Sequence, residues 1–172
     1  MFRGPNASGT RSDATPPVVI GPESSVAWKA EVPWSPSSPV VAGDRVFLTT
    51  FADGKLETRC YAGKDGALVW TRVSSHTELE GFHGTEGSPA AGSPATDGKT
   101  VVSYFGSTGL VAYDTEGKEL WKHPLPVGSS ATPMTYVSPK TGKQYVVISV
   151  GGAPYSPDKG DYVMAFALKG GK

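Results

Sequence analysis

The sequence has few of the features that mark the common catalytic, nucleic-acid-binding or membrane classes. It contains one cysteine, Cys60, so neither an intrachain disulfide nor a cysteine metal cluster can form. Its 16 basic and 16 acidic residues balance, which leaves no electrostatic footprint for nucleic acid or an anionic membrane. The longest apolar run, residues 145–150, is far shorter than the ~18 residues of a membrane span. We therefore expect no nucleic-acid partner and no membrane span.

A helical period of apolar residues is also missing, whereas β-rich runs follow one another along most of the chain. Pairs of such runs lie at residues 38–51, 99–114 and 143–168. The turns between runs carry glycine, which adopts positive φ at little cost. They occur at Asp53-Gly54, Asp65-Gly66, Asp97-Gly98, Glu116-Gly117 and Thr141-Gly142. The closely spaced hairpins predict an all-β antiparallel meander, with residues 1–23 as an N-terminal arm and residues 74–92 as a loop.

Three segments of the sequence are similar to one another. They cover residues 38–73, 93–125 and 132–168 within residues 24–172, and each begins with Ser-Pro or Thr-Pro. Similarity at intervals of about 40 to 50 residues, with about four strands in each interval, is typical of β-propeller blades. A β-sandwich with accidental similarity is the alternative fold. With a strand at residues 26–32 completing a blade, the chain holds about three blades, fewer than the roughly four to eight of a closed ring.

A tryptophan follows two of the turns at the same distance. In the second segment Ala112-Tyr113-Asp114 leads into Gly117, and Trp121 comes four positions later. This pattern resembles the tryptophan-docking motif of the pyrroloquinoline-quinone (PQQ)-like repeat family, in which each blade's outer tryptophan wedges against the neighbouring blade. The first segment also matches, except that Ala62 stands where the motif prefers Asp. The residues that the resemblance assigns to docking are Trp28, Gly66, Trp70, Asp114, Gly117 and Trp121.

The resemblance extends over most of the chain. Residues 2–6, with the sequence FRGPN, and residues 24–29 are similar to the start of secreted PQQ-binding-like β-propeller proteins. Residues 132–168 are similar to the C-terminal blade of membrane quinoprotein sugar and polyol dehydrogenases. The resemblance implies a bacterial protein that is periplasmic or secreted. The first ten residues have no apolar stretch, so we expect no signal peptide in this chain.

The third segment lacks a Gly-x-x-x-Trp strand, while residues 26–32 supply an unassigned strand with Trp28. We expect this strand to complete a blade. A head-to-tail homodimer would close a ring of six blades and bury the end faces and strand edges, which otherwise promote association. Rings of another size, or further blades lying elsewhere, are the alternatives.

The dehydrogenases of the family that this sequence resembles stack PQQ on a tryptophan, often under a disulfide between adjacent cysteines. They hold Ca²⁺ with carboxylate and amide side chains. Only one cysteine is present, and Ala153 follows Gly151-Gly152 where those dehydrogenases tend to place His. We therefore assign no catalytic residue and expect no cofactor, with PQQ and Ca²⁺ as the alternative. Trp34 is a candidate cofactor contact. His76, His83 and Glu86 are candidate metal ligands in a loop whose other interpretation is a solvated polar connection.

Three functions are consistent with the sequence. The first is a non-catalytic propeller scaffold that binds a protein partner on one face. The second is a PQQ-dependent sugar or alcohol dehydrogenase, or a degenerate relative, with a site shared between subunits. The third is a propeller that binds a small ligand or a metal ion on its axis. We favour the scaffold.

Overall fold

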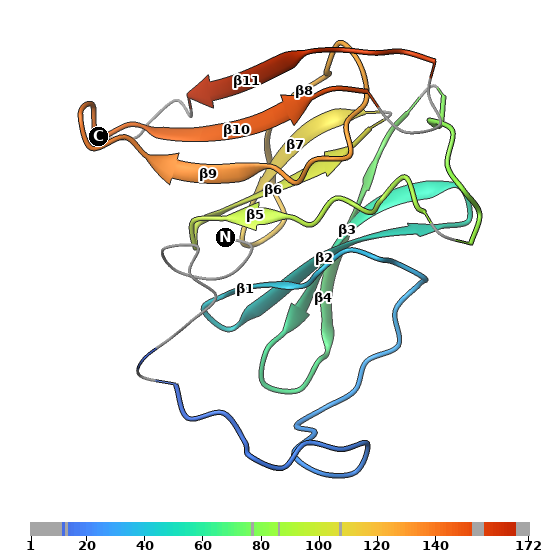
Figure 1. Cartoon of the computed structure of the whole chain (residues 1–172). Helices are drawn as coiled ribbons and strands as arrows, with labels where there is room; N and C mark the ends of the chain where they lie inside the picture. The colour runs from blue at the N-terminus through green and yellow to red at the C-terminus, as the bar shows by residue number, and fades with distance from the viewer. Residues whose placement is uncertain are drawn as a thin grey trace.

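The strands form three separate antiparallel sheets that lie one after another through the molecule (Figure 1). The computed structural model describes residues 12, 14–76, 78–85, 87–106, 108–152 and 157–167. The first sheet is ordered β1 (Val40–Ala42), β2 (Arg45–Ala52), β3 (Lys55–Ala62), β4 (Leu68–Ser74). The second is ordered β5 (Ala95–Thr96), β6 (Thr100–Phe105), β7 (Gly109–Asp114), β8 (Glu119–His123). The third is ordered β11 (Tyr162–Ala167), β10 (Gln144–Val150), β9 (Met134–Val137).

The all-β part of the prediction is confirmed, and the first two sheets repeat one another in detail. In both sheets a β-bulge interrupts the pairing of the third and fourth strands. It lies directly after the third-strand residue that pairs with the tryptophan. The shift follows the pair Cys60↔Trp70 in the first sheet and the pair Ala112↔Trp121 in the second. The predicted turn glycines Gly54, Gly66, Gly98, Gly117 and Gly142 all have positive φ. The first and second sheets are therefore two copies of one four-stranded unit, with the same turns and the same bulge.

Two hydrophobic cores hold successive sheets together. The core between the first and second sheets is built from apolar side chains of both, including Phe47, Leu56, Trp70, Val101 and Tyr113. The core between the second and third sheets includes Val102, Leu110, Ala112, Val146 and Ile148. Alternate residues of β6 face opposite cores, Val101 the first and Val102 the second. The second sheet is thus buried on both faces, as a blade inside a propeller must be.

Residues 26–32 differ from expectation. The sequence predicts a strand there, but these residues pair with no strand of the described part, which has eleven strands rather than the expected twelve. The segment lies at the far end of the first sheet from the second (Figure 1). A strand requires a neighbouring edge with free N–H and C=O groups. Trp28 instead holds the segment against the turn between β3 and β4, where there is no such edge.

Several residues singled out in the sequence lie outside the described part of the chain: residues 2–6, Glu86 and Ala153. In the described part, no helix is long and apolar enough to cross a bilayer.

Candidate functional site

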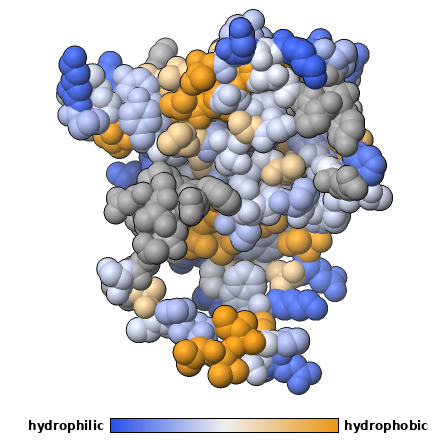
Figure 2. Space-filling model, viewed as in Figure 1, coloured by the Kyte–Doolittle hydropathy of each residue, from blue (hydrophilic) through white to orange (hydrophobic). Residues whose placement is uncertain are grey.

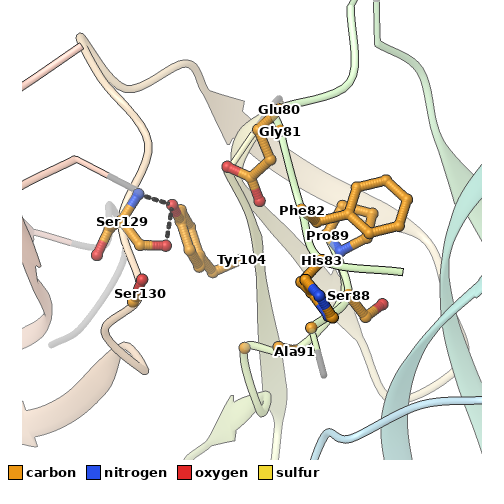
Figure 3. A pocket seen from close by; sticks show the side chains of 12 residues that line it. Glu80, Gly81, Phe82, His83, Ser88, Pro89, Ala91, Tyr104, Ser129 and Ser130 are labelled. Atoms are coloured by element: carbon orange, nitrogen blue, oxygen red, sulfur yellow. Dashed lines mark hydrogen bonds between the residues drawn. The ribbon is translucent and has the colours of Figure 1, made fainter. Parts of the chain in front are cut away.

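A small cavity of about 140 Å³ lies where the β4–β5 connection meets the second and third sheets (Figure 3). Its walls come from three parts of the chain. Residues 80–83 and 87–92 supply one side, Tyr104 at the end of β6 supplies another, and Ser129 and Ser130 before β9 supply the third. The cavity therefore exists only when consecutive sheets are packed together.

The β4–β5 connection is fixed by contacts with the first sheet. The hydroxyl of Thr49, fully buried in β2, donates to the carbonyl oxygen of Ala90 at 2.9 Å or of Gly92 at 2.8 Å. Phe82 packs edge-on against Phe51, with ring centroids 5.5 Å apart. These contacts connect a loop with no regular structure to a rigid strand, so the residues that line the cavity are held in place.

Tyr104 joins the second sheet to the third at the back of the cavity. Its Oη donates to the carbonyl oxygen of Ser129 at 2.8 Å and accepts from the backbone N–H of Ser129. The Ser129 hydroxyl donates in turn to Ser149 O in β10 at 2.6 Å. Burial, reinforced by the charge of Glu80, raises the pKa of Tyr104 well above its ordinary value. Tyr104 therefore remains a neutral hydrogen-bonding group.

Glu80 is the acidic group of the cavity. In the view of Figure 3 its carboxylate lies between Tyr104 on one side and Phe82 and His83 on the other. The carboxylate contacts Gly106, where any Cβ would overlap it. Burial raises the pKa of Glu80 to about 7. Near neutral pH the group is therefore partly protonated, and it can donate or accept a hydrogen bond toward a hydroxylated ligand.

The raised pKa of Glu80 predicts a specific pH dependence. The folded state keeps the proton where the unfolded chain releases it, so this stabilisation is complete below the ordinary pKa of 4.5 and is lost as pH rises through about 7. After allowance for solvent screening we expect a loss of about 1 to 2 kcal/mol. Glu80→Gln should flatten the decline, as measured by urea unfolding across this range. Glu78→Gln, on an exposed residue of the same loop, should not. Equal declines in both variants would contradict the assignment.

The three candidate site residues that the structure describes, Trp34, His76 and His83, do not share one site. Trp34 is 50% exposed and is not part of the cavity. His83 lines the cavity and its Nδ1 lies 3.2 Å from Thr85 Oγ1, whereas His76 Nε2 lies 2.9 Å from Gly54 O in the β2–β3 turn. Over the described ranges, no three His, Cys, Asp or Glu side chains converge. Ca²⁺ takes six to eight oxygen ligands, so these donors do not fit PQQ with Ca²⁺.

Glu80 and Tyr104 come together only through the packing of two sheets. The sequence places Glu80 in the loop at residues 74–92 and Tyr104 in a β-rich run, and neither is among its candidate site residues. The one local signal is Gly106, the glycine after β6 on which the Glu80 carboxylate rests.

The tryptophans form a second, repeated arrangement. Trp70 Nε1 donates to Thr115 O at 2.9 Å, and the indole lies flat against Gly117, whose Cβ would be 2.9 Å from Trp70 Cδ2. Trp28 does the same one sheet earlier: its Nε1 donates to Gly63 O at 2.7 Å, and its ring covers Gly66. Each indole is thus seated on the β-turn of the following sheet. Trp121 packs on Phe166 of β11, with ring centroids 5.8 Å apart.

The two docking turns differ at the position where the motif prefers Asp. In the second sheet Asp114 Oδ1 accepts from the backbone N–H groups of Glu116 at 3.0 Å and Lys118 at 2.8 Å. In the first sheet Ala62 occupies the corresponding place and offers no acceptor, but Asp65 Oδ1 accepts from Ala67 N at 3.1 Å. The turn therefore retains one of its side-chain hydrogen bonds by using a different carboxylate.

A larger groove of about 510 Å³ lies beside Trp121, His123 and Phe166. Its lining includes Ala167, the last residue that the structure describes, and we assign no site to it.

Comparison with known proteins identifies the repeat and several relatives. The family model described as outer membrane protein assembly factor BamB matches residues 18–171. The crystal structure of BamB from Moraxella catarrhalis superposes with a TM-score of 0.53, covering 85% of this chain and 41% of that one, at 19% identity. That likeness supports the propeller fold.

The sequence relatives described next are named as quinone or quinoprotein dehydrogenases. Quinate/shikimate dehydrogenase (quinone) of Acinetobacter baylyi is 58% identical over 88 residues, covering 48% of this chain and 11% of that protein. A probable quinate dehydrogenase (quinone) of Xanthomonas campestris pv. juglandis is 68% identical over 60 residues, covering 34% and 8%. Quinoprotein glucose dehydrogenase of Escherichia coli is 42% identical over 87 residues, covering 48% and 11%. The chain spans about a tenth of these relatives' length. It therefore belongs to the PQQ-like β-propeller repeat family described as outer membrane protein assembly factor BamB, with partial similarity to quinoprotein dehydrogenases.

Proposed function

We propose that this chain is a non-catalytic propeller scaffold of the cell envelope. The observation that carries the proposal is the repeated seating of Trp28 on Gly66 and Trp70 on Gly117. These contacts use the aromatic residues of the motif to join one sheet to the next. Tryptophan supplies a large apolar surface and one N–H donor, and both are engaged within the blades. Among the residues that the structure describes, no three His, Cys, Asp or Glu side chains come together as a metal site would require.

The size of the cavity supports the same conclusion. Sites that enclose a drug-sized molecule measure roughly 300 to 1,000 Å³. The Glu80–Tyr104 cavity, at about 140 Å³, is below that range. It can accept a hydroxyl-bearing edge of a ligand or a side chain of a partner, but it cannot enclose a redox cofactor together with its substrate.

The test is binding and turnover by the purified chain. PQQ and Ca²⁺ are added together, with quinate, shikimate or glucose as substrate and a dye as electron acceptor. The scaffold proposal expects no turnover, no bound-quinone absorption and an unchanged thermal midpoint, because a ligand that binds only the folded state raises stability by RT ln(1 + [L]/Kd). A raised midpoint with a bound-quinone spectrum would overturn it.

A second function is favoured by one specific observation, the 58% and 68% identity to dehydrogenases named for quinate. Under this alternative the described sheets supply blades of a quinone-linked dehydrogenase for cyclic polyols, and other blades complete the cofactor site. Turnover of quinate by this chain assembled with the blades that complete the site, with glucose oxidised more slowly, would establish it.

A further inference from the structure

The N-terminal segment at residues 26–32 repeats the sequence and the docking contact of an outer blade strand. Trp28-Lys29 matches Trp121-Lys122 of β8, and Trp28 meets the first sheet as Trp70 of β4 meets the second. In both cases the indole N–H donates to a turn carbonyl and the ring covers the turn glycine. The segment therefore occupies the place of a fourth strand belonging to a blade in front of the first sheet.

The third sheet has the complementary feature. Within the described residues it has three strands, and no strand lies along the outer edge of β11. In the second sheet that place beside β7 is taken by β8. The pairs Val102↔Ala112 and Val147↔Ala165 align β11 with β7, so Ala165 corresponds to Ala112, the partner of Trp121. A fourth strand on β11 would thus place its tryptophan opposite Ala165.

The face of the third sheet that points away from the second is apolar and uncovered. Val163 is 75% exposed, although the corresponding Leu110 of β7 is 1% exposed in the core. Met134 and Tyr136 of β9, which share this face through their pairs in β10, are 52% and 43% exposed. The opposite end of the molecule also exposes apolar side chains, in and before the N-terminal segment: Val18, Val19, Ile20 and Val26. Figure 2 shows apolar residues gathered at both ends.

We infer that these two ends bind each other between two copies of this chain. Residues 26–32 of one copy add to the β11 edge of the second copy as its fourth strand, antiparallel, with Trp28 opposite Ala165. The third sheet of the second copy then lies against the N-terminal end of the first copy. One chain cannot make this contact with itself, because the segment and β11 lie at opposite ends of the molecule (Figure 1).

Two such contacts related by a two-fold axis close a ring. Three sheets from each copy give six blades, within the range of roughly four to eight that propellers use. In each copy closure covers the β11 edge and the exposed apolar face of the third sheet, which would otherwise direct continued association. The second copy is therefore the occupant that fits both ends at once.

The register can be tested with a disulfide between copies. β8 pairs His123 with Leu110, so the same register places Ala30 of one copy opposite Val163 of the other. Facing positions in an antiparallel pair have Cα atoms roughly 4.5–5.5 Å apart, within the range that a disulfide spans. We expect Ala30→Cys/Val163→Cys to form a dimer linked under mild oxidation. The native Cys60 does not compete, because it is fully buried, and burial raises its pKa to about 11.

The matched control moves one cysteine by one residue. Met164 is half-buried and packs toward the second sheet, so Ala30→Cys/Met164→Cys has its two thiols on opposite faces of the pair and should remain unlinked. The unmodified chain should sediment at twice its 17.9 kDa mass. A monomer, an open polymer, or equal linking in the two variants would overturn the proposal.

Discussion

Replacing Trp70 with alanine is expected to lower the free energy of unfolding by about 3 to 5 kcal/mol, as large-to-small core changes of this type do. Trp70 is 7% exposed and contacts Phe47 and Tyr113, with ring centroids 5.9 Å away in each case. Its Nε1 also donates to Thr115 O. The substitution therefore leaves a cavity between two sheets and removes a hydrogen bond that joins them.

Urea unfolding followed by circular dichroism measures this loss, and Trp34→Ala is the matched control. Trp34 is 50% exposed, so we expect its removal to cost less than about 1 kcal/mol. A Trp70→Ala variant as stable as Trp34→Ala would show that the indole does not join the first two sheets. Unfolding in two separate steps would show that each sheet folds independently of the next.

The hairpins could be predicted from the sequence because their determinants are local. The dipeptides Asp53-Gly54 and Asp97-Gly98 each predict a turn, because glycine tolerates the positive φ that both glycines adopt. The repeated Trp-docking motif was equally readable because Gly66 and Trp70, like Gly117 and Trp121, are close together in the sequence. Local turn chemistry and a fixed spacing between segments were sufficient to indicate blades.

The candidate site could not be predicted in the same way. Glu80 and Tyr104 line one cavity because the loop is anchored through Thr49 and lies against the second sheet, and neither contact is local in the sequence. The histidines shared a loop with Glu80, but His76 is instead within hydrogen-bonding distance of Gly54 O. A strand was expected at residues 26–32 because their composition suits one. Pairing, however, depends on whether an edge lies beside them, which composition does not specify.

The contact between a tryptophan and a turn glycine occurs twice in this chain. Trp70 of the first sheet lies on the turn glycine Gly117 of the second, and Trp28 of the N-terminal segment lies in the same way on Gly66 of the first sheet. Because Trp28 repeats the contact that joins the first two sheets within one chain, the same contact can join sheets from different chains.

Gly117→Ala is the sharpest probe of the joint itself. Gly117 has a φ of +82°, and an added Cβ would lie 2.9 Å from Trp70 Cδ2 and 3.0 Å from Cε2. The Gly117 carbonyl also accepts from Arg72 Nε at 2.6 Å. The added methyl group must displace the indole of Trp70, and alanine must also adopt a strained positive φ. We expect a loss of about 2 to 4 kcal/mol in the free energy of unfolding.

Gly98→Ala separates the two contributions. Gly98 has a φ of +94°, but a Cβ there meets nothing within 4 Å, so only the backbone strain of about 1 to 2 kcal/mol remains. The difference between the two variants, measured in the same urea titrations, is the steric cost of displacing Trp70. Gly117→Ala should also weaken the Trp70→Ala effect in a double-mutant cycle, because both changes disrupt one contact. Additive losses would mean that the glycine serves the turn alone and that the indole is held by its core neighbours.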